Sequence, residues 1–220
     1  MSSFAPDSDA ATILAYHRGA ARYAEHSRDR AGLGRLRDAL IALLPPRPLV
    51  LDLGSGPGHD ADLLASMGAR VVALDAAEGL LRQSRHYEAL AGRLITGEAR
   101  HLPFADASFD GIWSCASLLH VPYTGVPLAL SEAFRVLRPG GVVFFSLSEG
   151  DSSGPILVAD LGLATRTYYY HEAADWAAML RAQAFEIVSH TVNRSAGNFN
   201  PGSTGWIETY ARRPTSKPAQ

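Results

Sequence analysis

Apolar residues in this chain form short continuous runs, and stretches with helical spacing separate them. Runs of this kind are typical of strands that are buried on both faces of a parallel sheet. They predict strands at 49–54, 70–75, 93–96, 109–114 and 142–147. The stretches between them predict helices at 59–67, from 76 to about 90, and at 126–137. Because strands alternate with helices, the pattern indicates the α/β class.

Different patterns flank this alternating region. Before it, helical spacing predicts helices at 10–26 and 29–44; after it, 149–170 is the least regular part and 171–184 predicts a helix. Strands at 185–192 and 205–212, joined by a glycine- and asparagine-rich loop, predict an antiparallel hairpin. We therefore expect a three-layer α/β sandwich with a seven-stranded, mostly parallel sheet, a C-terminal antiparallel hairpin and two extra N-terminal helices. This is one domain, 1–220, with a helical cap at 1–48, a core at 49–148 and a substrate-side segment with the hairpin at 149–213.

A glycine turn follows the first predicted strand, in the sequence LVLDLGSGPGHD. Gly54, Gly56 and Gly58 stand at alternate positions, and helical character resumes after them. Glycine lets a ligand approach the backbone and permits positive φ, while the start of the next helix directs its amide dipoles at the ligand. A dinucleotide fingerprint, G-x-G-x-x-G, would place its third glycine at position 59, where this chain has His59.

Three sequence blocks together resemble the class I S-adenosylmethionine-dependent methyltransferases. The first is Asp-Leu-Gly-Ser-Gly-Pro-Gly at 52–58, the second is GEARHLPF at 97–104 with Ser-Phe-Asp at 108–110, and the third is Arg-Pro-Gly-Gly at 138–141. The resemblance covers about 49–147 and implies S-adenosylmethionine as the cofactor. In this family the terminal hairpin separates the sheet from a dinucleotide-binding one, and added N-terminal helices cover the cofactor and help to form the substrate pocket.

The resemblance also implies a cofactor site. The glycine turn would cradle the amino-acid end of the cofactor, the acid at the tip of the second strand would bind the ribose, and the 98–99 pair would meet the adenine. Glu98 stands where Asp is commoner, and Ala76 where the family usually has a larger apolar residue. The expected cofactor-binding residues are Asp52, Gly54, Ser55, Gly56, Gly58, Asp75, Ala76, Glu98, Ala99 and Ser114, with Tyr16 and Tyr23 from the cap.

Several of these residues have a second interpretation. Asp75 lies 21 positions after Gly54, a spacing that suits both ribose hydroxyls of an adenosine, but it also suits the cap of the following helix. Tyr16 and Tyr23 either face the pocket or lie on one buried stripe, since they are seven positions apart. The lone Cys115 is interpreted as a packed side chain, because no basic neighbour in the sequence would activate it.

His120 is the candidate catalytic residue. It follows the carboxyl end of the fourth strand, where ligands of open α/β sheets bind, and histidine titrates near neutral pH. We expect it to act as a general base toward the methyl acceptor; the alternative is a structural hydrogen bond in its loop.

Composition restricts the function further. The chain has 220 residues, a net charge of −2 and one cysteine, so it carries no electrostatic footprint for nucleic acid and cannot form an intrachain disulfide or a cysteine metal cluster. We expect a cytoplasmic enzyme that needs no metal, binds neither nucleic acid nor membrane, and methylates an O, N or other nucleophile of a small, partly apolar molecule. The oligomeric state stays open. The alternatives are a non-catalytic protein that binds an adenosyl ligand and a nicotinamide-dependent oxidoreductase.

Overall fold

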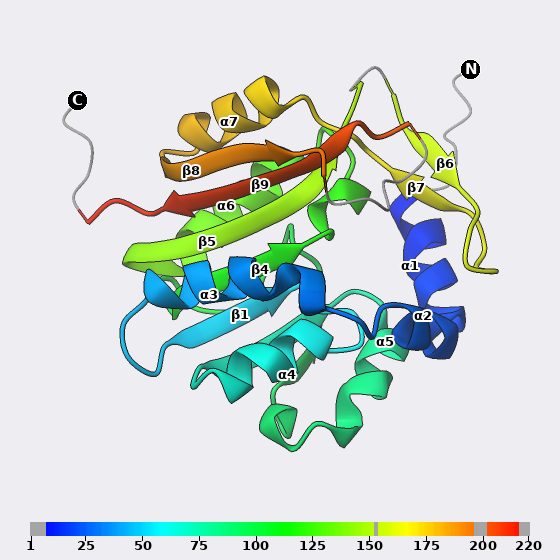
Figure 1. Ribbon diagram of the computed structural model, residues 1–220, viewed down its shortest axis with the longest axis horizontal. Coiled ribbons are helices and arrows are strands. Elements are labelled where there is room, and N and C mark those ends of the chain that lie inside the picture. Colours follow the sequence, from blue (N-terminus) through cyan, green and yellow to red (C-terminus); the bar gives the residue numbers. More distant parts are fainter. Residues whose placement is uncertain (1–7, 152–153, 196–201, 216–220) are drawn as a thin grey trace.

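A seven-stranded sheet forms the centre of the computed structural model, which describes residues 8–151, 154–195 and 202–215 (Figure 1). The strand order is β3-β2-β1-β4-β5-β9-β8. Strands β1 to β5 are parallel to one another, and β9 is antiparallel to both β5 and β8. This confirms the predicted mostly parallel sheet with a C-terminal hairpin. Part of the loop predicted for that hairpin, 196–201, lies outside the described residues. The strands are β1 (Leu49–Leu53), β2 (Arg70–Asp75), β3 (Leu94–Thr96), β4 (Phe109–Cys115), β5 (Leu137–Glu149), β8 (Glu186–Asn193) and β9 (Gly205–Arg212).

Helices cover both faces of the sheet, as the three-layer prediction requires. On one face, α3 (Gly34–Ala42) and α4 (His59–Ser66) contribute Leu40 and Leu64 to a buried cluster with Val50. On the other face, α6 (Val126–Val136) and α7 (Ala173–Ala182) pack on Leu51 and Leu53 and their neighbours. Successive residues of β1 thus point to opposite helical layers, and both layers are apolar. Among the described helices, none has the length and apolar character that a membrane crossing requires.

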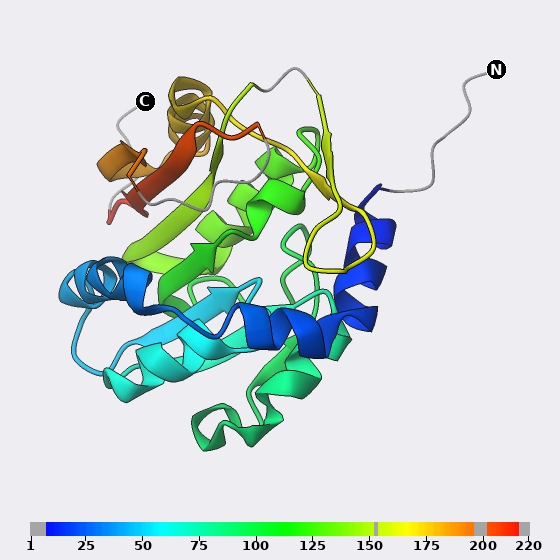
Figure 2. The same ribbon diagram turned by 45° about the vertical axis from the view of Figure 1, so that its right-hand side comes forward.

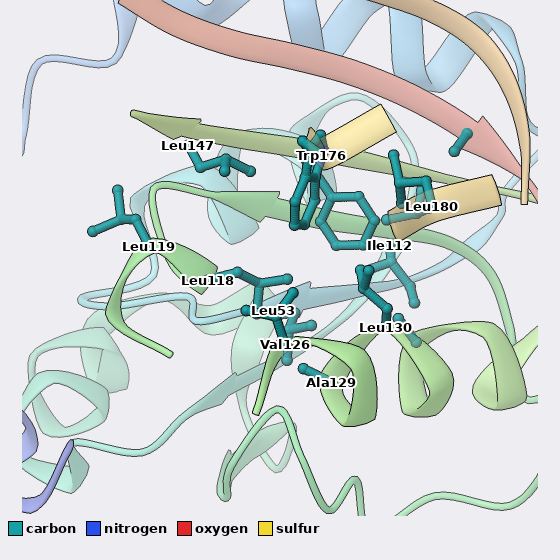
Figure 3. Packing of buried hydrophobic residues seen from close by; sticks show 14 of the residues in the cluster. Leu53, Ile112, Leu118, Leu119, Val126, Ala129, Leu130, Leu147, Trp176 and Leu180 are labelled. Atoms are coloured by element: carbon teal, nitrogen blue, oxygen red, sulfur yellow. The ribbon is translucent and has the colours of Figure 1, made fainter. Parts of the chain in front are cut away.

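The larger cluster fastens α6 and α7 to the sheet (Figure 3). Leu130 on α6 and Trp176 and Leu180 on α7 meet Ile112 of β4, and all four side chains are fully buried. Truncating a buried leucine to alanine costs about 2–5 kcal/mol in comparable cores. The carboxyl edge of the sheet is therefore held on a rigid support.

The N-terminal cap differs from the prediction in one respect. The helix expected at 10–26 is two helices, α1 (Ser8–Arg18) and α2 (Ala20–His26), followed by a 3-10 turn at Ala31–Leu33 before α3. The break is at Gly19, whose φ of −92° and ψ of 11° leave the helical region. A Cβ at Gly19 would lie 2.0 Å from Cδ2 of Leu163, so the close approach of a distant segment requires glycine there. Helical spacing continued across this position and gave no sign of the break.

The segment that looked irregular in the sequence contains a second, two-stranded sheet. Strands β6 (Ile156–Val158) and β7 (Arg166–Tyr168) form an antiparallel hairpin. The hairpin lies beside α1 in both ribbon views (Figures 1 and 2), and Thr167 N–H donates a 2.9 Å hydrogen bond to Thr12 Oγ1 on α1. The helix expected to reach residue 90 is also shorter, since α5 (Glu78–Gln83) ends early and the 3-10 turns Ser84–His86 and Glu88–Leu90 follow it.

Candidate active site

The glycine turn lies where the chain changes direction within the sheet. β2 continues from β1 on one side and β4 lies on the other, so a crevice opens at the carboxyl ends of these strands. The turn is fastened to β2, because the N–H groups of Gly54 and Ser55 donate to the Leu74 carbonyl at 2.8 and 3.0 Å. The main chain of the turn therefore forms one wall of the crevice.

The three glycines of the turn serve two purposes. All have positive φ: +75° at Gly54, +55° at Gly56 and +80° at Gly58. A Cβ at Gly54 would lie 1.8 Å from the Ser117 hydroxyl oxygen, and one at Gly58 would lie 2.6 Å from that of Ser84. At Gly56 the nearest protein atom would be 3.8 Å away, so this glycine keeps open space in front of the backbone.

A single pocket gathers most of the residues that the sequence singled out. Gly58 and Ser114 do not line it. Gly58 lies against Ser84, and Ser114 is buried in β4. Lining residues among the predicted ones are Tyr16, Tyr23, Asp52, Gly54, Ser55, Gly56, Asp75, Ala76, Glu98, Ala99 and His120.

Asp75 connects the turn to the start of α5. Its Oδ2 accepts from Gly56 N–H and its Oδ1 accepts from Ala77 N–H, both at 2.8 Å. Burial raises the pKa of this carboxyl above its ordinary value, although the two backbone donors oppose the shift. The cap-like hydrogen bond to Ala77 is thus present, and each oxygen keeps a second lone pair on which ribose hydroxyls could be held.

An ion network below the pocket was missed by the sequence analysis. Asp60 at the start of α4 accepts hydrogen bonds from Arg30, from Arg37 at 2.7 Å and from the indole of Trp113 at 3.2 Å. Burial acts to raise the pKa of Asp60, but the charge of Arg30 and these donors hold it below its usual value. Arg30 also lines the pocket. Arg30 and Arg37 are seven positions apart in the stretch predicted as a helix, but Arg30 precedes the 3-10 turn and only Arg37 lies on α3.

Asp52 is the least satisfied polar group of the pocket. Its side chain is 2 % exposed, and within the described residues its Oδ2 has no hydrogen-bond partner. Burial and the nearby charge of Asp60 raise its pKa well above the usual range. The main chain of Ala61 donates to this carboxyl, so only Oδ2 lacks a donor. A buried oxygen without a donor is costly, so its position on the pocket wall suits a ligand that brings one.

The loop after β3 has its own anchoring. Glu98 accepts a 2.8 Å hydrogen bond from Arg100, and Arg100 also pairs with Asp9 of α1 at 2.9 Å. The Leu102 N–H donates to Glu132 of α6 at 2.8 Å. The Leu-Pro-Phe turn is therefore held by α6, while Glu98 and Ala99 face the pocket.

His120 has both ring nitrogens engaged. Nδ1 is 2.8 Å from the Thr167 carbonyl and Nε2 is 3.0 Å from the Tyr16 hydroxyl, which also accepts from Arg166 at 3.0 Å. Burial is the main cause that lowers the pKa of His120 to about 4. The general-base role stays a prediction, and it now carries a condition: the ring must give up Tyr16 to take a proton from an acceptor.

The thiol of Cys115 and the arrangement of metal-binding side chains also bear on the chemistry. Burial raises the pKa of the Cys115 thiol to about 12, so it remains protonated at neutral pH, consistent with a packed cysteine. In the described parts of the chain, no group of three or more His, Cys, Asp or Glu side chains is arranged to hold a metal ion.

Comparison with known proteins agrees with this architecture. Residues 51–145 match the family model described as "Methyltransferase domain". A 1,6-didemethyltoxoflavin-N1-methyltransferase from Burkholderia thailandensis, solved with its substrate and S-adenosylhomocysteine, superposes with a TM-score of 0.72 at 22% identity, over 97% of this chain and 93% of that one. The [4+2]-cyclase SpnF superposes with a TM-score of 0.74 at 19% identity, over 96% and 98% of the two chains. At such identities the superpositions show the fold alone.

Sequence relatives are more similar but match only in part. A malonyl-[acyl-carrier protein] O-methyltransferase of Enterobacter lignolyticus is 35% identical over 150 residues, which are 64% of this chain and 55% of the relative. The biotin biosynthesis bifunctional protein BioHC of Cellvibrio japonicus is 42% identical over 117 residues, 53% of this chain and 23% of the relative. The chain thus spans about half or less of the length of these relatives.

The fold and these matches agree on one class: the chain has the fold of the class I, Rossmann-like S-adenosylmethionine-dependent methyltransferases, and its central part matches a methyltransferase domain. More specifically, the match to the methyltransferase domain runs from β1 to β5 and includes the glycine turn, and the similar structure from Burkholderia thailandensis holds S-adenosylhomocysteine.

Proposed function

We propose that this protein transfers a methyl group from S-adenosylmethionine to a nucleophilic atom of a small, partly apolar molecule. The observation that carries the proposal is the buried Asp52 carboxylate, which faces the pocket beside Arg30 and beside the opening at Gly56. An unsatisfied acid next to a guanidinium suits the ammonium and carboxylate of an amino acid. When bound, the cofactor supplies a methyl group that its sulfonium already activates.

In this proposal, different residues of the pocket bind different parts of the cofactor. Asp52 accepts a hydrogen bond from the ammonium group and Arg30 donates one to the carboxylate group of the cofactor. The main chain of Gly54, Ser55 and Gly56 lies against this amino-acid end. The next group holds the nucleoside, through hydrogen bonds to the ribose and contacts with the adenine: Asp75, Ala76, Glu98 and Ala99. Asp75 is already placed by two backbone donors, so little ordering of this residue is needed on binding.

The acceptor lies, in the same proposal, between the cap and the end of β4. Tyr16, Tyr23 and His120 line that side of the pocket, and the ring centroids of the two tyrosines are 5.0 Å apart in an edge-to-face arrangement. Their work is to hold the acceptor in line with the methyl group and to exclude water. We also propose that the protein works in the cytoplasm and does not act on nucleic acid, since its net charge is −2.

The relatives suggest one acceptor to include in the test. Several are named for O-methylation of a malonyl group on an acyl carrier protein. We propose a carboxylic acid, free or carried, as the first acceptor class to examine.

Calorimetry and a transfer assay test the proposal together. We expect S-adenosylhomocysteine to bind and NAD not to bind, and we expect transfer of labelled methyl from S-adenosylmethionine to at least one member of a panel of carboxylic acids, malonyl-acyl carrier protein, phenols and amines. Binding without any transfer would favour a non-catalytic adenosyl-binding protein, and NAD binding would favour an oxidoreductase.

A further inference from the structure

A continuous chain of hydrogen bonds crosses the acceptor end of the pocket. It joins three segments that are far apart in the sequence: Arg166 of β7, Tyr16 of α1, and His120 in the 3-10 turn Leu118–His120. The chain ends on the main chain of β7, because His120 is bonded to the Thr167 carbonyl at 2.8 Å. The cap, the hairpin and the end of β4 are therefore connected by side chains at one point.

The direction of each hydrogen bond in this chain follows from its donors. A guanidinium only donates and a carbonyl only accepts. Tyr16 therefore accepts from Arg166 and uses its single proton toward Nε2 of His120, and the imidazole carries its proton on Nδ1, toward Thr167. With a neutral imidazole, this arrangement of protons makes all three bonds; Tyr168 is a further hydrogen-bond partner of Tyr16.

Arg166 is held in place from the side opposite to its Tyr16 bond. Its side chain is 1 % exposed and forms an ion pair with Asp160. The guanidinium carbon also lies 5.1 Å from the centre of the Tyr16 ring and 5.7 Å from that of Tyr168. A guanidinium enclosed in this way is fixed in position. The groups that face His120 are thus Tyr16 from α1, and Arg166 and Tyr168 from β7.

We propose that Arg166 is a positioning residue for the acceptor: it holds the Tyr16 hydroxyl with its proton on His120, and the pocket therefore takes an acceptor whose attacking oxygen is already ionised, such as a carboxylate. An incoming hydroxyl would need His120 to release Tyr16 before its proton could be accepted. An ionised oxygen has no proton to lose, so it can attack while the bond between Tyr16 and His120 stays intact. The inference rests on the proposed methyl transfer and specifies its acceptor.

Binding of a charged probe and of a neutral probe tests the inference. With protein saturated with S-adenosylhomocysteine, we expect malonate to bind at least about tenfold more tightly than malonamide, which has the same shape without charge. Arg166→Met and Tyr16→Phe should each weaken malonate by about tenfold or more. Arg166→Met, which changes a residue that does not line the pocket, should also leave the affinity for S-adenosylhomocysteine within about twofold. Arg166→Lys should recover part of the loss. Arg22→Met is the matched control, since the exposed Arg22 bonds to the Gly162 carbonyl of the same hairpin without contacting Tyr16.

A spectroscopic measurement keeps the inference testable apart from affinity. Nitrogen NMR of His120 should report a neutral ring protonated on Nδ1 in the wild type and in Arg22→Met, and a changed Nε2 signal in Tyr16→Phe. Equal affinity for malonate and malonamide, no malonate binding, or an unchanged malonate affinity in both Arg166 variants would overturn the inference. Failure of the wild type to bind S-adenosylhomocysteine would instead refute the proposed function.

Discussion

The N–H of Gly56 donates a 2.8 Å hydrogen bond to Oδ2 of Asp75, which joins the middle of the glycine turn to the end of the neighbouring strand. The same carboxylate accepts from Ala77 through Oδ1, so one side chain shapes the turn and begins α5. The two interpretations that the sequence left open for this acid, ligand site and helix cap, are therefore compatible. A test must separate its effect on binding from its effect on folding.

Replacing Asp75 should affect both properties by different amounts. Asp75→Ala removes two hydrogen bonds to a charged acceptor, each worth about 1.5–3 kcal/mol, and should lower the free energy of unfolding accordingly. We expect affinity for S-adenosylhomocysteine to fall by at least about tenfold in the folded variant, or about 1.4 kcal/mol. Urea denaturation and calorimetry measure the two quantities. Loss of stability with unchanged affinity would show that Asp75 acts only as a helix cap and does not bind the ligand.

Gly56 should tolerate a side chain in the empty protein but not in the complex. The space before it is open, so Gly56→Val should fold with a moderate penalty for its positive φ and lose at least about tenfold in affinity for S-adenosylhomocysteine. Gly68→Val is the matched control, because Gly68 has a φ of +92° and no atom within 4 Å of an added Cβ, and it does not line the pocket. If both variants bind like the wild type, the turn does not contact the cofactor.

The ion network at Asp60 should be more important than the surface pairs. Arg37→Met leaves a buried carboxylate with one partner fewer, a change that costs about 3–5 kcal/mol in buried pairs. Arg82→Met removes an exposed pair with Glu78 and should cost less than about 1 kcal/mol. Chemical denaturation followed by tryptophan fluorescence measures both variants, and Trp113, whose indole donates to Asp60, contributes to that signal. Equal stability of the two variants would contradict the expectation that the Asp60 network contributes more to stability than a surface ion pair.

The part of this molecule that could be predicted from sequence is the part that local patterns determine. Gly54, Gly56 and Gly58 are needed by the turn itself, and Asp75 follows an apolar run of fixed length, so both were found without knowledge of the fold. The β6–β7 hairpin was missed because its strands have three residues each, too few for an alternating pattern to show, and the middle residue of β6, Leu157, is an apolar residue that is 71 % exposed.

The missed residues of the site depend on contacts between distant segments. Arg30 and Asp60 are 30 positions apart, and Tyr16 and Arg166 are 150 apart, so neither pair leaves a periodic signal in the chain. His120 was found by its position at the end of β4, but its hydrogen bonds depend on where the cap and the hairpin lie. Its role could not be inferred from position alone for the same reason.

The last prediction concerns His171, a buried histidine outside the candidate site. Its ring is 1 % exposed and packs against Tyr123 and Trp176 at centroid distances of 5.3 and 5.4 Å. Burial lowers its pKa to about 4, below the value of about 6.5 that the unfolded chain would have. The unfolded state therefore binds more protons than the folded state between these two values, and the histidine makes the protein less stable as the pH falls from about 6.5 to about 4.

Comparing two proteins isolates this contribution from the other acids. His171→Phe keeps an aromatic ring and cannot titrate, so its stability relative to the wild type should rise as the pH falls from 7 to 5. The measurement is urea denaturation of both proteins at each pH. The quantity compared is the change in the free energy of unfolding between pH 7 and pH 5, in the variant and in the wild type. Carboxyls such as Asp52, whose pKa is raised, titrate in both proteins alike and cancel in this difference. If the two proteins lose stability in parallel, His171 is not kept neutral by the fold, and the acid sensitivity arises elsewhere.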